Sequence, residues 1–98
     1  MTGIIIRARV QPEHRHELMQ MFKETSQPNQ LPATCLGRQL YEEAIAPTNL
    51  LMVEEWSEEE AMHLYLSSER FRALIGAVKV LGELADVRIS ESILVETG

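Results

Sequence analysis

The three histidines, His14, His16 and His63, are the side chains best suited to bind a metal or to move protons near neutral pH. His14 and His16 lie two positions apart, and side chains with that spacing do not converge on a helix. No set of histidine, cysteine and carboxylate residues has the spacing of metal ligands. We therefore expect no metal site, and the simplest interpretation places the histidines on solvated helix surfaces.

Other reactive side chains have simple structural explanations. Glu58, Glu59 and Glu60 follow Ser57 in the pattern of a capping box, which would start a helix. Cys35 is the single cysteine and cannot form an internal disulfide. A small apolar strand residue is a more common role for such a thiol than a nucleophile. These residues therefore predict structure rather than catalysis.

Two arginines, Arg7 and Arg9, share one side of the first predicted strand. We expect them to pair with carboxylates such as Glu54 or Glu55, either across strands or across a subunit interface. Binding of an anionic ligand is the alternative.

The overall charge limits the possible partners. The 98 residues carry a net charge of −6 at pH 7 and form no basic cluster, which argues against nucleic acid and anionic membranes as partners. No apolar run approaches the ~20 residues of a membrane span. The apolar part of MTGIIIRARV is short for a signal peptide. We expect a cytoplasmic protein whose residues 1–98 form a single domain.

Hydrophobic periodicity locates the elements that must position these side chains. In chain order it predicts a strand from Ile4 to Val10, a helix from Pro12 to Thr25, strands from Cys35 to Glu43 and from Leu50 to Trp56, a helical segment that follows Ser57, restarts at Ser67 and Ser68 and stops at Gly82, and a strand from Asp86 to Thr97.

This β-α-β-β-α-β order predicts an α+β, ferredoxin-like antiparallel sheet with its helices on one face. The other face would still carry apolar residues on every strand. An uncovered apolar face of that size usually marks an interface. We therefore expect a homodimer in which two sheets pack face to face as a dimeric α/β barrel.

The segment APTNLLMVEEWSEEEAMHLYLSSERFRALI resembles the antibiotic biosynthesis monooxygenase (ABM) family. Its family-like features are a turn with Pro and Asn, a strand that ends Glu-Glu-Trp, and an acidic helix start. The preceding LPATCLGRQLYEE is similar to the family's second strand, through Cys35, Leu40 and Tyr41. The resemblance extends from about Ile4 to Leu81. The family often has histidine where this chain has Tyr65, and Pro-His-Phe where it has Glu69-Arg70-Phe71.

The resemblance implies a cofactor-independent monooxygenase that acts on a small phenol, hydroquinone or anthrone. A deprotonated, delocalised substrate can itself give an electron to O₂, so neither flavin nor metal is needed. The protein must then supply an apolar pocket, a group that steers the proton and donors for the oxyanion. Tyr65 and Trp56 are the candidate catalytic residues, and the candidate substrate pocket is lined by Met62, Phe71, Phe22 and Met52.

Structural roles compete with these assignments. Trp56 could equally be a core residue that seals the sheet against the helices. Tyr65 could equally be a half-buried packing residue. The alternative function is therefore a dimeric barrel that binds a hydrophobic small molecule without turnover, in stress response or regulation. Haem binding is a third reading, although His63 lies on a different helix face from Tyr65.

Overall fold

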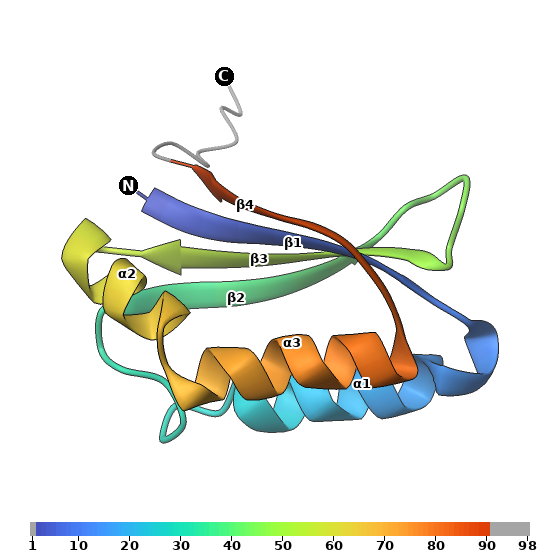
Figure 1. Ribbon diagram of the computed structural model, residues 1–98, viewed down its shortest axis with the longest axis horizontal. Coiled ribbons are helices and arrows are strands. Elements are labelled where there is room, and N and C mark those ends of the chain that lie inside the picture. Colours follow the sequence, from blue (N-terminus) through green and yellow to red (C-terminus); the bar gives the residue numbers. More distant parts are fainter. Residues whose placement is uncertain (1, 91–98) are drawn as a thin grey trace.

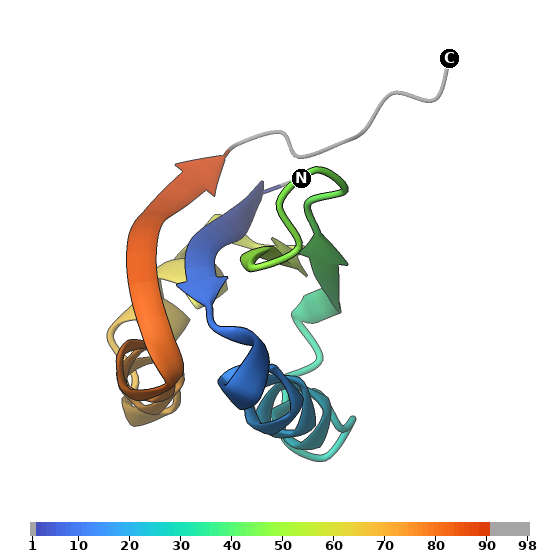
Figure 2. The ribbon, with the colours of Figure 1, turned by 90° about the vertical axis from the view of Figure 1, so that its right-hand side faces the viewer.

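The computed structural model describes residues 2–90. Its elements, in chain order, are β1 (Thr2–Val10), α1 (Pro12–Thr25), β2 (Cys35–Glu42), β3 (Asn49–Trp56), α2 (Glu59–Leu66), α3 (Glu69–Leu81) and β4 (Gly82–Ser90). The four strands form one antiparallel sheet in the order β2-β3-β1-β4. The helices lie on one side of this sheet (Figures 1 and 2). The predicted α+β, ferredoxin-like fold is confirmed.

The core lies between the sheet and the helices. Alternate residues of the central strands β1 and β3 point to the helices, as the period of a half-buried strand requires. Each helix adds two buried side chains to this layer. The buried set is Ile4, Ile6, Ala8, Val10, Leu18, Phe22, Leu50, Met52, Trp56, Met62, Tyr65, Leu74 and Val78.

The predicted capping box is wrong. The N-cap of α2 is Glu58, which makes no side-chain cap hydrogen bond. Ser57 is engaged elsewhere, because its backbone N–H and its hydroxyl both donate to the carbonyl of Thr34, at 2.9 and 3.3 Å. Ser57 therefore joins the end of β3 to the segment before β2 instead of starting a helix.

The predicted restart at Ser67 and Ser68 is a real break between α2 and α3. The Ser68 hydroxyl accepts from the amide of Phe71 at 3.2 Å and so caps α3. It also donates to the carbonyl of Tyr65 at 2.6 Å. One side chain therefore ends α2 and begins α3, and this turn fixes Tyr65 relative to α3.

The last strand begins four residues earlier than predicted. β4 follows α3 directly at Gly82, where the sequence predicted a helix stop but no strand. A Cβ at Gly82 would lie 2.3 Å from the carbonyl oxygen of Arg9, so the close approach of β1 and β4 requires glycine there. The end of the predicted strand, with Ile93 and Val95, lies outside the described residues.

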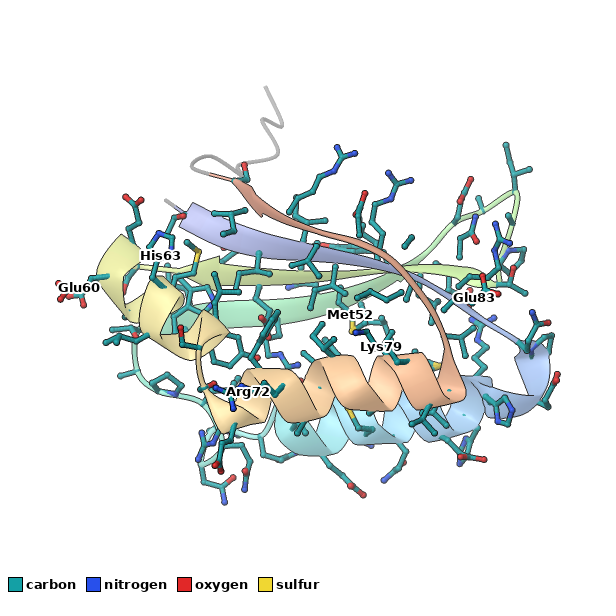
Figure 3. The ribbon with its side chains drawn as sticks, viewed as in Figure 1. Met52, Glu60, His63, Arg72, Lys79 and Glu83 are labelled. Carbon is teal, nitrogen blue, oxygen red and sulfur yellow. The ribbon has the colours of Figure 1, made fainter. Side chains whose placement is uncertain are left out.

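The sheet surface that faces away from the helices is called the open face below. Register places Ile5 opposite Val53 and Arg7 opposite Leu51 on it. A half-open hollow of about 620 Å³ lies on it. Figure 3 shows no helix on this side of the strands. No helix in the described part of the chain is long and apolar enough to cross a membrane.

The predicted partner of the open-face arginines is wrong in one respect. Glu54 points to the helices, on the other side of the sheet from Arg7 and Arg9. Arg9 instead donates to the side-chain oxygen of Asn49 at 3.4 Å. Between residues 2 and 90, neither arginine forms an ion pair.

Candidate active site

A hollow of about 170 Å³, called the helix-side pocket, lies between α1, α3 and the segment that follows α1. Its wall is mostly apolar, and its polar groups come from five parts of the chain. Exposed Gln30 and Arg70 stand at its mouth, whereas Arg38 and Tyr65 lie at its buried end. The lining residues are Met21, Thr25, Gln30, Leu31, Arg38, Tyr65, Arg70, Ala73 and Leu74.

A buried ion pair supports the inner end of this pocket. Arg38 of β2 and Glu54 of β3 are register partners, and the guanidinium Nε lies 2.7 Å from Glu54 Oε2. The two side chains are 2% and 0% exposed. A charge removed from water needs a close partner, and here each ion neutralises the other.

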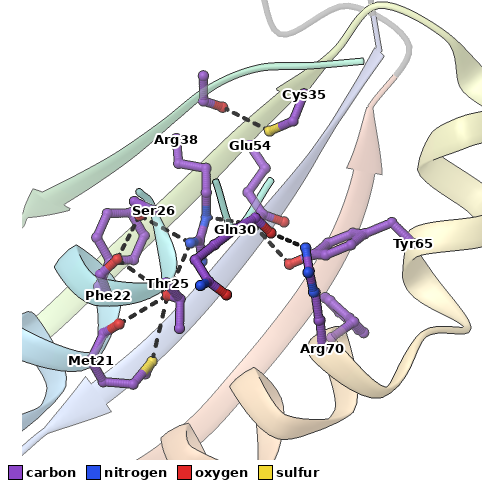
Figure 4. A network of polar contacts seen from close by, with 12 residues as sticks. Met21, Phe22, Thr25, Ser26, Gln30, Cys35, Arg38, Glu54, Tyr65 and Arg70 are labelled. Atoms are coloured by element: carbon purple, nitrogen blue, oxygen red, sulfur yellow. Dashed lines mark hydrogen bonds and ion pairs between the residues drawn. The ribbon is translucent and has the colours of Figure 1, made fainter. Parts of the chain in front are cut away.

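Helix α1 completes the surroundings of Arg38 (Figure 4). The guanidinium donates to the hydroxyls of Thr25 and Ser26, at 3.0 and 2.9 Å. It also lies over the ring of Phe22, 4.6 Å from the ring centre. Planar, hydrogen-bonded and stacked, this arginine holds a fixed orientation beside the pocket.

Tyr65 connects the ion pair to the pocket. Its hydroxyl donates to Glu54 Oε2 at 3.0 Å, and the residue also lines the pocket. The other carboxylate oxygen, Oε1, is buried and has no hydrogen-bond partner among residues 2–90. Glu54 can therefore accept one more proton without breaking a contact.

The titration of this group follows from burial. Desolvation raises the pKa of Glu54 above its ordinary value, although Arg38 and the Tyr65 hydrogen bond act in the opposite direction. Burial and, next, the charge of Glu54 raise the pKa of Tyr65, so its phenol stays protonated. Tyr65 is therefore a hydrogen-bond donor at neutral pH, and Glu54 is the proton acceptor of the group.

Two further aromatic rings pack against the Tyr65 ring of this group. Trp56 and Tyr65 pack with ring centres 4.8 Å apart, and Phe71 meets Tyr65 edge-on at 5.4 Å. Such tilted and edge-on contacts suit aromatic rings and restrict the tyrosine to one position. The indole N–H of Trp56 is buried without a hydrogen-bond partner in the described residues.

The structure brings some predicted site residues together and leaves others apart. Tyr65 lines the helix-side pocket, and Trp56 and Phe71 pack against its ring from outside the pocket lining. Met62 and Met52 are fully buried in the core. Phe22 lies under Arg38. The catalytic and substrate-binding roles of these six residues stay predictions.

Sequence reasoning missed Arg38 and Glu54 as a pair. The signal was present in the third strand, where Leu50, Met52, Glu54 and Trp56 alternate and place a carboxylate on the core face. A buried carboxylate requires a cation or several donors. The neighbouring strand offered Arg38 as that cation.

The remaining reactive residues lie away from the pocket. The His63 side chain is 54% exposed and lies 3.5 Å from Glu59. No group of histidine, cysteine and carboxylate residues that could hold a metal ion occurs between residues 2 and 90. Cys35 is half-buried, and burial raises the pKa of its thiol, so it is a poor nucleophile.

Comparisons with known proteins bear on this site. The family model described as antibiotic biosynthesis monooxygenase matches residues 1–77. No curated protein matches the chain.

Solved structures with the same fold include a candidate antibiotic biosynthesis monooxygenase from Deinococcus radiodurans, which is 26% identical with a TM-score of 0.74 over 92% of this chain and 88% of that one. A conserved protein from Methanosarcina mazei Go1 is 22% identical, with a TM-score of 0.76 over 91% and 89%. SnoaB, a cofactor-independent oxygenase from Streptomyces nogalater solved as a point mutant, is 13% identical, with a TM-score of 0.79 over 99% and 97%. The last two are similar in fold alone.

Proposed function

The chain belongs to the antibiotic biosynthesis monooxygenase family, and we propose that it is a cofactor-independent monooxygenase of a small, electron-rich aromatic substrate. The observation that carries the proposal is the Tyr65–Glu54–Arg38 group at the inner end of an apolar pocket. The name of SnoaB, a cofactor-independent oxygenase with the same fold, supports the reaction class.

Pocket size favours a substrate with one aromatic ring. The helix-side pocket measures about 170 Å³, and a cavity of ~150 Å³ is enough to bind benzene. A phenol or hydroquinone therefore fits the pocket as it stands. A three-ring anthrone would require α1 and α3 to move apart.

The first step is proton transfer through Tyr65. A substrate hydroxyl donates to the Tyr65 oxygen while Tyr65 passes its own proton to Glu54. Burial raises the pKa of Glu54 toward neutral pH, and a general base works best when its pKa lies near the working pH. Arg38 also lines the pocket, and its positive charge stabilises the phenolate that forms.

The phenolate then reacts with O₂ without help from a cofactor. One electron passes from the ring to O₂, and the two radicals combine into a ring peroxide anion. This anion takes back through Tyr65 the proton that Glu54 accepted and becomes a ring hydroperoxide. Loss of water leaves a carbonyl on the ring carbon. One oxygen atom ends in the quinone product and the other in water, and the ring supplies all the electrons.

Oxygen consumption tests the proposal. Purified, metal-free protein is mixed with single-ring hydroquinones and with anthrones, and uptake is compared with uncatalysed autoxidation. We expect saturable uptake that favours the single-ring substrates and falls at least ~100-fold in kcat/KM in Tyr65→Phe.

Tyr41→Phe is the matched control, because Tyr41 lies on the open face, is 49% exposed and donates its hydroxyl proton to Gln39 rather than to any residue of the pocket. It should keep full activity. Uptake no faster than autoxidation across the whole panel would overturn the proposal and favour a barrel that binds an aromatic molecule without turnover.

A further inference from the structure

The charges that line the helix-side pocket do not balance. Among residues 2–90, two charged side chains line it, Arg38 and Arg70, and both are cationic, although the whole chain has a net charge of −6. Glu54 neutralises Arg38 behind the pocket wall. Arg70 forms no ion pair within the described part of the chain.

Arg70 has one contact that explains its position. Its guanidinium donates to the backbone carbonyl of Gln30, and this contact joins α3 to the segment after α1 at the pocket mouth (Figure 4). A guanidinium carries several N–H donors, so one carbonyl leaves others free for a planar anion. Arg70 also lies in the first turn of α3, where the helix dipole favours negative charge.

The two ends of the pocket thus differ in chemistry. Tyr65, Glu54 and Arg38 at the inner end can take a proton from a hydroxyl and hold the resulting oxyanion. Arg70 at the mouth can hold a fixed anion that never reacts. A wall of Met21, Leu31, Ala73 and Leu74 lies between them and suits an aromatic ring.

We propose that the substrate is a single-ring phenol that carries a carboxylate, with its hydroxyl at Tyr65 and its carboxylate at Arg70. This inference rests on the proposed function, since it names the substrate class of the same site. Arg70 is then a specificity residue, which selects the acid over its uncharged analogues without taking part in the oxidation.

Anaerobic titration calorimetry separates binding from turnover. The probes are 2,5-dihydroxyphenylacetate and its uncharged amide, which have nearly the same shape. We expect the wild-type protein to bind the acid at least ~10-fold more tightly, as a charge-assisted, two-pronged contact allows. Arg70→Gln should reduce the affinity for the acid to that for the amide and leave the amide unchanged, whereas Arg70→Lys should keep part of the preference.

Arg72→Gln is the matched control, because Arg72 is an exposed arginine on the same helix that bonds to the carbonyl of Ser67 and does not line the pocket. It should bind both probes as the wild type does. Equal binding of acid and amide by the wild-type protein would overturn the inference. So would an equal loss for both probes in Arg70→Gln, which would make Arg70 a purely structural link to Gln30.

Oxygen uptake with the same two probes keeps the two proposals apart. Turnover of both probes with equal KM would refute the carboxylate preference and leave the oxygenase intact. A preference for the acid in binding with no oxygen uptake from either probe would refute the oxygenase while the pocket still selects acids. When both proposals hold, Arg70→Gln raises KM for the acid about tenfold and leaves kcat unchanged.

Discussion

Glu54 is a carboxylate inside a hydrophobic core, and the surrounding residues show how the protein tolerates it. Arg38 supplies the opposite charge and Tyr65 a hydrogen bond, both on the same oxygen, Oε2. Desolvation still outweighs these contacts and raises the pKa. The protein therefore keeps a base of raised basicity where a purely structural core would have an apolar residue.

The raised pKa predicts how stability depends on pH. Between the ordinary value of 4.5 and the folded-state pKa of Glu54, the folded protein binds more protons than the unfolded chain. The free energy of unfolding therefore falls as pH rises through this window, by at most about 1.4 kcal/mol per pH unit. Glu54→Gln should remove this slope in urea titrations at several pH values.

Glu55→Gln is the control, since Glu55 lies on the other side of the sheet and should keep the wild-type slope. Parallel profiles for the wild type and Glu54→Gln would contradict the prediction.

The ionised form of Glu54 is also the form that accepts the proton from Tyr65. The kcat/KM of the wild type should therefore increase with pH through the pKa of Glu54.

The Arg38–Glu54 pair makes a second prediction at this scale. Arg38→Met leaves a buried carboxylate without its cation, which should cost about 3–5 kcal/mol in the free energy of unfolding. Adding Glu54→Leu should recover most of that loss, because two apolar residues need no counter-charge. Denaturant unfolding of both single variants and the double variant gives the coupling energy between the two residues. If the two losses simply add, Arg38 and Glu54 contribute to stability independently, and the prediction fails.

At the scale of elements, Ser57 and Ser68 differ in whether they cap a helix, although the sequence after Ser57 has the better-known capping pattern. Ser68 caps α3 and Ser57 does not cap α2. Ser68→Ala should therefore lower the free energy of unfolding by about 1 kcal/mol, within the usual range for a lost cap. Ser57→Ala should lower it by less, because its backbone bond to Thr34 remains. Chemical denaturation checks both; equal losses would contradict the assignment.

Strand and helix identities could be read from the sequence because periodicity depends on local residue types. Period-two alternation predicted β1 and the later part of β4, and the apolar stripe of Leu18 and Phe22 predicted α1. The start of β4 could not be predicted in this way. Gly82 belongs to a strand only because β1 lies close enough for its backbone to pair, and that closeness is a tertiary fact.

The site residues also divide into those that the sequence identified and those that depend on tertiary structure. The resemblance to the antibiotic biosynthesis monooxygenase family made Tyr65 and Trp56 candidates, and the structure packs their rings together. The Arg38–Glu54 pairing depends on the register of β2 against β3. The irregularity between Cys35 and Gly37 sets that register, and no local pattern marks it.

At the scale of the whole molecule, the open face is an uncovered apolar surface of the kind that usually forms an interface. Its apolar residues include Ile5, Leu51 and Val53, and it carries a half-open hollow of about 620 Å³. We propose that a second copy of the chain packs here, as the sequence predicted. Light scattering on a sizing column should give the mass of two chains, and Val53→Glu should give one.

Val80→Glu is the control for this prediction, because Val80 is an exposed valine on α3 that lies away from the open face. It should remain a dimer. A wild-type protein with the mass of a single chain at micromolar concentration would contradict the proposal.

The central place of β1 in the sheet has a consequence for synthesis on the ribosome. β1 is the earliest strand, yet its partner β3 follows only after α1 and β2, and its partner β4 follows only after α3 (Figure 1). A nascent chain that has passed β3 but not Gly82 leaves one edge of β1 unpaired, with Ile4 and Ile6 beside it. Such an edge invites pairing with other chains. Between the emergence of β3 and of β4, the edge of β1 that later pairs with β4 is therefore open to other chains.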